Sequence, residues 1–200
     1  MLKRYICVAT EKRKKRIASV ITNRHPGIIV LEDIHDPHNA AAVFRTCDAF
    51  GFQQVYLIFE KEKKFNPRRV GKVSSASANK WLDFKIYSST KKCIADLKRK
   101  KYEIVASTLN DSSENLFQAK FKSYKTALMF GNEHRGLSDA AIKLSHRQII
   151  IPMFGMVQSL NLSVTAAICM YELTRQNQFS KNFQLTKKEQ TELLNRFKKM

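Results

Sequence analysis

Short apolar runs alternate with helical stretches along most of the chain, and this alternation limits the folds available to it. Ile28-Ile29-Val30-Leu31 is a continuous apolar run, typical of a strand buried on both faces. The pattern predicts an α/β domain with a mainly parallel sheet and helices on both faces. Further strands are predicted at 54–59, 81–87, 103–109, 127–130 and 148–153, and helices at 3–23, 39–50, 90–101, 138–145, 160–175 and 186–199.

Polar, glycine-containing segments follow three of the predicted strands. These segments cover residues 32–39, 131–138 and 154–161. In open parallel sheets, ligands bind beyond the carboxyl ends of the strands, where such segments meet. The three segments therefore predict one ligand site at a single edge of the sheet.

The first segment leads into a helix that carries a basic side chain. Pro37 stiffens the turn, Asn39 can cap or enter the helix, and Gly51 can end it. Arg45 lies about two turns into this helix, and its planar guanidinium suits phosphate recognition. The alternative is an ordinary ion pair between Arg45 and Asp48 on the same helix.

The second and third segments bring small and hydrogen-bonding residues to the predicted edge. Gly131 allows a ligand to approach the backbone, and Ser138 can cap the following helix. Glu133 taken alone would be an ordinary surface acid. Ser159 and Asn161 place short polar groups in the turn before an apolar helix, where they can cap that helix, bind a ligand, or do both.

A large positive charge indicates a polyanionic partner. Lysine and arginine number 36 against 17 acidic residues, which gives a formal net charge of +19. Nucleic acid is favoured over a basic surface without a partner, and over anionic lipid, because the charge is clustered. Charge alone decides neither between DNA and RNA nor whether the chain is an enzyme. The clusters lie at 12–16, 61–64, 68–69, 98–101, 187–188 and 196–199.

Several classes of protein find no support in the sequence. It contains neither a Gly-x-Gly-x-x-Gly fingerprint nor a Walker loop, which argues against dinucleotide enzymes and P-loop ATPases. No apolar run is long enough to span a bilayer, and we expect a cytoplasmic protein without a membrane partner. The four cysteines show no metal-ligand spacing, so we expect core-filling thiols and no metal. They are Cys7, Cys47, Cys93 and Cys169.

Taken together, the three segments resemble the signature motifs of the SpoU (TrmH-like) branch of the SPOUT methyltransferases. The resemblance extends over roughly residues 1–180. The matching residues are His35-x-Pro37-His38-Asn39 with Arg45-Thr46-x-Asp48-Ala49-x-Gly51, then Phe130-Gly131-x-Glu133-x-x-Gly136, then Ile151-Pro152-Met153-x-Gly155-Met156-Val157-Gln158-Ser159-Leu160-Asn161-x-Ser163-Val164.

The resemblance implies an activity and an architecture. The activity is methyl transfer from S-adenosyl-L-methionine to a ribose 2′-hydroxyl of RNA. Within the branch, the pattern is most similar to enzymes acting on guanosine 18 in the D-loop of tRNA. Ribosomal RNA, another tRNA position, or a catalytically silent RNA-binding protein remain alternatives. The implied architecture is a homodimer with the active site at the subunit interface and a C-terminal trefoil knot.

The resemblance also assigns roles to residues. Arg45 lies at the reactive oxygen, and Asn39, Glu133, Ser159 and Asn161 shape the pocket. Three regions follow: residues 1–26 as a basic RNA-contacting helix, 27–178 as the methyltransferase domain, and 179–200 as a basic C-terminal helix that contacts RNA or only packs. The cofactor would lie on backbone groups around Ser107, Thr108, Leu109, Gly131, Ile151, Met153 and Leu160.

Overall fold

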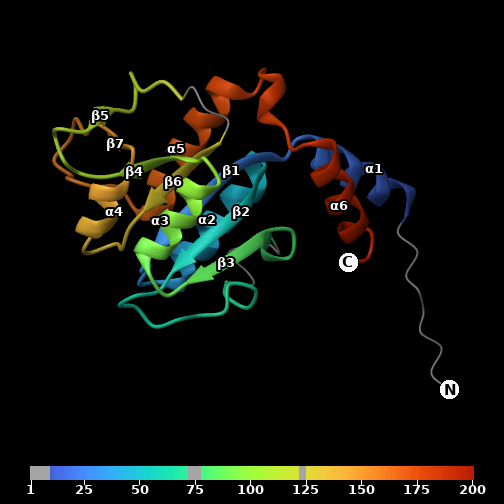
Figure 1. Cartoon of the computed structure of the whole chain (residues 1–200), viewed down its shortest axis with the longest axis horizontal. Coiled ribbons are helices and arrows are strands. Elements are labelled where there is room, and N and C mark those ends of the chain that lie inside the picture. Colours follow the sequence, from blue (N-terminus) through green and yellow to red (C-terminus); the bar gives the residue numbers. More distant parts are fainter. Residues whose placement is uncertain (1–9, 72–77, 122–124) are drawn as a thin grey trace.

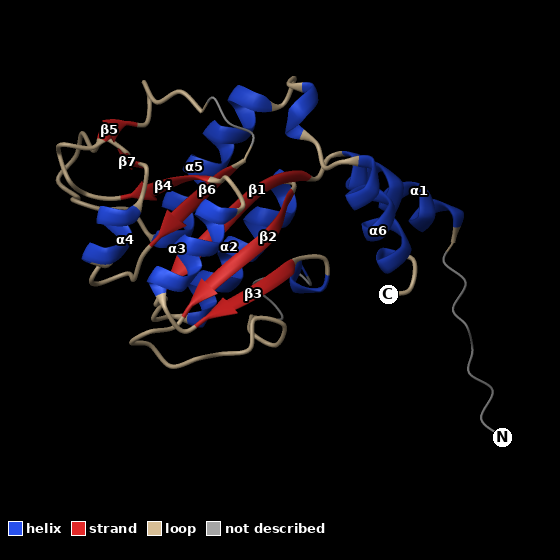
Figure 2. Cartoon of the chain, in the orientation of Figure 1, coloured by secondary structure: helices blue, strands red, loops and turns tan. Residues whose placement is uncertain are grey.

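The computed structural model describes residues 10–71, 78–121 and 125–200. Its centre is a seven-stranded sheet in the order β3-β2-β1-β6-β4-β7-β5, and every pairing in it is parallel (Figure 2). The predicted parallel α/β architecture is therefore confirmed. The strands are β1 (His25–Glu32), β2 (Phe52–Ile58), β3 (Asp83–Tyr87), β4 (Glu103–Ser107), β5 (Glu114–Asn115), β6 (Thr126–Phe130) and β7 (Arg147–Ile150).

Helices cover both faces of the sheet. Helices α2 (Pro37–Phe50) and α5 (Leu162–Asn177) pack on one face, and α3 (Thr90–Arg99) and α4 (Asp139–Leu144) pack on the other. Every residue of β1 is buried, because its side chains alternate between the two resulting cores. No helix in the described ranges has the length and apolar character needed to cross a membrane.

The ends of α2 follow from its sequence. Asp36 caps the helix through a 2.8 Å hydrogen bond from the His38 N–H, and Pro37 occupies the first turn. Asn39 therefore enters the helix and does not cap it. Gly51 ends the helix as predicted, at a φ of 83°, where a Cβ atom would lie 2.4 Å from a main-chain oxygen.

Several strand predictions differ from the structure. The strands predicted at 81–87 and 103–109 are each two residues too long, because β3 begins at Asp83 and β4 ends at Ser107. The first strand begins at His25, three residues before the apolar run. The predicted strand at 148–153 ends at Ile150, which leaves Ile151 and Met153 beyond it. Strand β5 is not predicted because it is two residues long and has no apolar run. It is defined only by its pairing with β7.

Two terminal helices form a separate pair beside the sheet. Figure 1 shows α1 (Glu11–Thr22) and α6 (Lys187–Phe197) side by side, near the start of β1. Ile17 and Ile21 of α1 pack against Leu193 and Phe197 of α6. We call α1 and α6 the end-helix pair. Residues 3–9 of the predicted first helix lie outside the described residues. The division into three regions and the trefoil knot remain predictions.

The described cysteines are core residues. Cys47, Cys93 and Cys169 are free and buried, as predicted for small core-filling thiols. Burial raises the pKa of the Cys93 thiol, and that of the Cys169 thiol, to about 12. Such thiols are poor nucleophiles at neutral pH. Cys7 lies outside the described residues.

Two short 3₁₀ helices complete the described part of the fold. The first, η1 (Ala78–Lys80), precedes β3, and the second, η2 (Lys181–Phe183), leads from α5 toward α6. The Leu185 N–H after η2 donates to the Arg24 carbonyl at 3.0 Å. This bond joins the two connections by which the end-helix pair is attached to the rest of the domain, to β1 and to α5.

Candidate active site

A cavity of about 700 Å³ lies beyond the carboxyl ends of β4 and β6 and beside the segment that follows β7. We call it the strand-end cavity. Its volume suits a molecule of cofactor size. All residues predicted to lie around the cofactor line it, namely Ser107, Thr108, Leu109, Gly131, Ile151, Met153 and Leu160. Four of the five predicted catalytic residues line it too, namely Asn39, Glu133, Ser159 and Asn161.

A chain of hydrogen bonds connects the three polar segments at this cavity. The side-chain amide of Asn39 donates to Glu133 Oε1 at 2.9 Å, and Asn161 Nδ2 donates to Asn39 Oδ1 at 3.1 Å. The Glu133 carboxylate also accepts the main-chain N–H groups of His35, at 2.8 Å, and Asp36, at 3.2 Å. Glu133 is therefore held in one orientation by donors from the first segment.

The turn that carries Glu133 folds back on itself. Asn132 and Gly136 exchange two main-chain hydrogen bonds, of 3.0 and 2.8 Å. A Cβ atom on Gly131 would lie 2.2 Å from backbone atoms of Gly136 and Leu137, so only glycine fits. Thus Gly131 is required by the turn itself, in addition to leaving its backbone open toward the cavity.

Asn161 both caps a helix and bridges two segments. Its Oδ1 accepts the Ser163 N–H at 2.8 Å and the Ser163 hydroxyl at 2.6 Å, which caps α5. Its amide nitrogen remains for Asn39. Ser159 is exposed at the cavity, with its side chain open to a ligand.

Arg45 is not among the residues that line the cavity. It lies on an exposed part of α2, and its side chain has no hydrogen bond or ion pair with the described residues. The alternative ion pair with Asp48 is wrong. Asp48 instead pairs with the guanidinium of Arg24, whose side chain is buried. Arg45 is therefore available to a partner molecule.

A charged cluster at the rim of the cavity is not predicted from the sequence. The Glu62 carboxylate accepts hydrogen bonds from Arg135 at 2.7 Å and from His35 Nδ1 at 3.2 Å. These two bonds, first that from Arg135, lower the pKa of Glu62. The Asn132 amide donates to the Asp33 carbonyl at 2.6 Å and approaches Glu62 at 3.3 Å. Asn132 lies inside the second motif, and this position is a signal for a role in the site. Nothing in the sequence around Glu62 distinguishes it from an ordinary surface acid.

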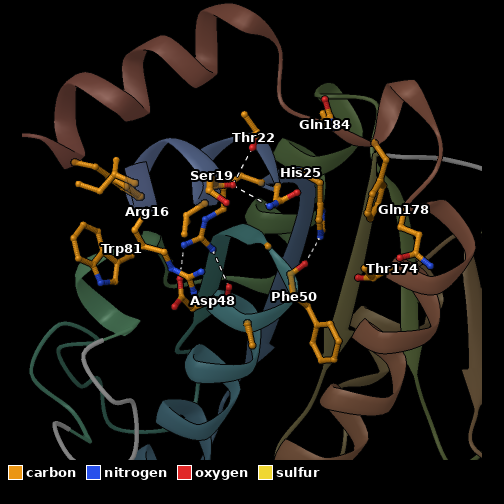
Figure 3. A pocket seen from close by; sticks show the side chains of 18 residues that line it. Arg16, Ser19, Thr22, His25, Asp48, Phe50, Trp81, Thr174, Gln178 and Gln184 are labelled. Carbon is orange, nitrogen blue, oxygen red and sulfur yellow. Dashed lines mark hydrogen bonds and ion pairs between the residues drawn. The ribbon is translucent and has the colours of Figure 1, made fainter. Parts of the chain in front are cut away.

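A second cavity, of about 590 Å³, lies away from these residues. It is enclosed by the end-helix pair and the carboxyl ends of α2 and α5 (Figure 3). The buried Arg24 donates to the carbonyls of Asp48 and Phe52, both at 3.4 Å, and so closes the end of α2. The His25 ring bonds the Phe50 carbonyl at 3.0 Å. None of the predicted catalytic or cofactor residues lines this cavity.

The strand-end cavity offers neutral amides, a held carboxylate and an apolar wall. Within the described part of the chain, no three His, Cys, Asp or Glu side chains are grouped so as to hold a metal ion. Such a lining suits a ligand with both polar and apolar parts, held by backbone groups and a few side chains.

Comparison with known proteins identifies the family. The sequence model of the SpoU rRNA Methylase family matches residues 26–171, which include all three polar segments. The chain belongs to this family. The match confirms the SpoU resemblance predicted from the motifs.

Individual SpoU relatives cover most of the chain. It is 33% identical over 188 residues to a tRNA (guanosine(18)-2'-O)-methyltransferase of Escherichia coli (strain K12), with 91% of this chain and 80% of the relative covered. A Thermus thermophilus protein of the same name is 34% identical over 173 residues, covering 84% of each. The solved A. aeolicus TrmH/SpoU tRNA modifying enzyme superposes with a TM-score of 0.84 at 29% identity, covering 94% of this chain and 95% of that one.

Proposed function

We propose that this SpoU-family protein transfers a methyl group from S-adenosyl-L-methionine to the ribose 2′-hydroxyl of guanosine 18 in tRNA. The observation that carries the proposal is the hydrogen-bonded chain Asn161–Asn39–Glu133 at the strand-end cavity. Two relatives named for this reaction support the choice of substrate, and the net charge of +19 suits a polyanion. We expect the protein to act in the cytoplasm, and its C-terminal part to be threaded into a knot.

The strand-end cavity suits the cofactor. Its apolar wall includes Leu109, Ile151 and Leu160, and the turn at Gly131 leaves no room for a side chain. Backbone groups of these segments would hold the adenosine part, and no metal is required. When bound, S-adenosyl-L-methionine supplies an electrophilic methyl group on its sulfonium.

Arg45 would reach the cavity of a second subunit. In one chain it lies on α2 outside the cavity, while Asn39 of the same helix lines the cavity. A homodimer could bring α2 of one subunit to the cavity of the other. Arg45 would then join the four predicted catalytic residues that line this cavity, without rearrangement of either chain. Arg45 of the partner subunit would then face the residues Asn39 and Glu133.

Exposed apolar side chains support a dimer through this region. Val164 and Tyr171 lie two turns apart on the exposed side of α5, and Tyr171 contacts Phe50 of α2. Phe154 is 89% exposed and Met156 fully exposed in the segment before α5. We expect the second subunit to cover these side chains.

The residues of this chain would orient and activate the 2′-hydroxyl. The partner's Arg45 would hold the adjacent phosphate and stabilise the negative charge that develops on the oxygen. It stays protonated, because a neutral guanidinium is costly. Asn39 and Glu133 would position the ribose, and the hydroxyl proton would leave toward water or a phosphate oxygen.

The function is tested by methylation of defined RNAs. The purified protein is incubated with labelled S-adenosyl-L-methionine and a tRNA transcript, and the modified ribose is mapped. A transcript whose guanosine 18 already carries a 2′-O-methyl group is the matched control. We expect label at guanosine 18 and none in the control. Label elsewhere in tRNA, or in ribosomal RNA alone, would reassign the substrate, and no label in any RNA would reject the activity.

A further inference from the structure

In the loop after β2, the acidic side chains contact the protein and the lysine side chains point to solvent. Residues 60–64 read Glu-Lys-Glu-Lys-Lys, and we call them the basic loop. Its two acids are engaged by the protein: Glu60 accepts the Thr90 N–H and hydroxyl, each at 3.0 Å, and Glu62 accepts Arg135 and His35. Its three lysines are exposed, and their side chains have no partner within the described ranges. They are Lys61, Lys63 and Lys64.

The backbone of the basic loop is pinned to the sheet. One carboxylate oxygen of Asp33 accepts three successive main-chain N–H groups, of Glu60 at 2.8 Å, Lys61 at 3.0 Å and Glu62 at 3.2 Å. Asp33 itself is 7% exposed and has a φ of 51°, a conformation that L-residues rarely adopt. The loop is thus held by a buried, strained residue directly after β1.

The same contacts connect the basic loop to the residues that bear the proposed reaction. The Asp33 carbonyl accepts Asn132, and Asn132 precedes Glu133 in the folded-back turn. Glu62 binds His35, whose main-chain N–H is bonded to Glu133. A single network of hydrogen bonds therefore runs from the loop to the Glu133 carboxylate.

The location of the basic loop gives it a task that the end-helix pair does not share. The segment that follows β2 leaves the sheet at the carboxyl ends of the strands, whereas α1 and α6 lie near the start of β1 (Figure 1). In one chain the loop therefore adds three lysines to the rim of the strand-end cavity, where Arg135 also lies. A ribose entering this cavity brings its flanking phosphates to the rim.

We propose that the lysines of the basic loop bind the phosphates that flank the target ribose, and that Glu62 is a positioning residue that, together with Asp33, holds the loop there. The inference rests on the proposed function, because it assigns the RNA contact nearest to that site. Glu62 is paired with Arg135, and Glu60 is turned toward the neutral donors of Thr90, whereas the three lysines have no partner among the described residues. The loop therefore presents three positive side chains on a fixed backbone.

Replacing the three lysines tests the binding role. The variant Lys61→Gln/Lys63→Gln/Lys64→Gln is compared with Lys80→Gln/Lys120→Gln/Lys143→Gln, which removes the same charge from three exposed lysines outside the basic clusters. tRNA affinity is measured by fluorescence anisotropy at several salt concentrations. The plot of log affinity against log salt has a negative slope. We expect this slope to become shallower by about 2–3 in the loop variant and by less than about 1 in the control. Equal slopes in both variants would overturn the proposal.

Removing Glu62 separates positioning from charge. Glu62→Ala raises the net charge by one and frees Arg135, so charge alone predicts tighter tRNA binding. If Glu62 positions the loop, the variant binds tRNA more weakly and its KM for tRNA rises about tenfold or more, with S-adenosyl-L-methionine affinity unchanged. Unchanged or tighter tRNA binding by Glu62→Ala would reject the positioning role.

The wild-type protein in the same assays separates this inference from the proposed function. If the wild type neither binds nor methylates tRNA, the proposed substrate is wrong. If it methylates tRNA and the loop variant matches its control in both affinity and salt slope, the proposed function stands and the loop inference fails.

Discussion

The Asn39 side chain donates to Glu133 at 2.9 Å and thereby lies between two of the motifs of the family. Its carbonyl oxygen accepts Asn161 from the third motif. Asn39 must therefore present nitrogen to a carboxylate and oxygen to an amide. Asparagine provides the donor and the acceptor on separate atoms of one short side chain, whereas an ionised aspartate offers acceptors only.

Asn39→Asp should be more harmful than Asn39→Ala, although aspartate is closer in shape. Aspartate would place a second carboxylate against Glu133, and like charges at this distance repel. We expect Asn39→Asp to have the lower melting temperature at pH 8, and the gap between the variants to close toward pH 4 as one carboxylate gains a proton. Melting curves of both variants at several pH values measure this. A constant gap would contradict the predicted repulsion.

Arg45→Ala should abolish methylation while cofactor binding and dimerisation survive. Loss of one charge-stabilising group at a reacting oxygen typically costs ~10²–10³-fold in rate. Arg45→Lys keeps the charge and loses the planar fork, so it reports whether charge or geometry matters more. Single-turnover rates with saturating tRNA, together with calorimetry for the cofactor, measure both effects. Near wild-type rates in both variants would remove Arg45 from the reaction.

A mixed dimer tests whether Arg45 acts across the subunit interface. One subunit carries Arg45→Ala and the other Asn39→Ala, each with a different affinity tag for purification of the heterodimer. If the partner's Arg45 completes each site, one of the two sites contains both intact residues, and we expect about half the wild-type activity. If Arg45 acts within its own chain, both sites lack a residue and the heterodimer stays inactive.

Much of the fold and of the strand-end cavity could be predicted from the sequence, because the signals are local. A continuous apolar run such as 28–31 needs burial on both faces wherever it lies, and the polar segments after such runs must meet at one edge. The sequence also contains the reason why Arg45 lies outside the cavity that Asn39 lines. It follows Asn39 by six residues, so the two side chains point about 120° apart around α2 and cannot both face one cavity closely.

Other features depend on contacts between distant segments and leave no local trace. Strand β5 is defined only by its pairing with β7. Glu62 approaches Arg135 from a loop 73 residues away in the sequence, and the lysines on either side of it give no sign of this contact. Asp48 is paired with Arg24 and not with Arg45 because α1 ends beside the end of α2.

The end-helix pair should contribute to tRNA binding through one face only. Leu193 and Phe197 are buried against α1, so deleting α6 would also expose Ile17 and Ile21. The sharper variant is Lys187→Gln/Lys188→Gln, which changes two exposed side chains and no packing. We expect weaker tRNA binding, a salt slope lower by about 1–2, and unchanged cofactor affinity. If affinity and slope do not change, α6 serves only in packing.

His25 should make the protein sensitive to acid. Burial lowers the pKa of the His25 ring to about 3, from an ordinary value near 6.5 in the unfolded chain. The unfolded state therefore binds more protons than the folded state between these values. The stability that depends on neutral His25 is complete above pH 6.5 and is lost as the pH falls toward 3.

A variant of His25 measures this loss. His25→Gln is neutral at every pH, so the difference in unfolding free energy between wild type and variant should be constant above pH 7. Between pH 6 and 4 the wild type should lose roughly 1.4 kcal/mol of unfolding free energy per pH unit relative to His25→Gln. Urea unfolding at each pH gives the free energies, and parallel curves for wild type and His25→Gln would mean that His25 gains its proton without unfolding the chain.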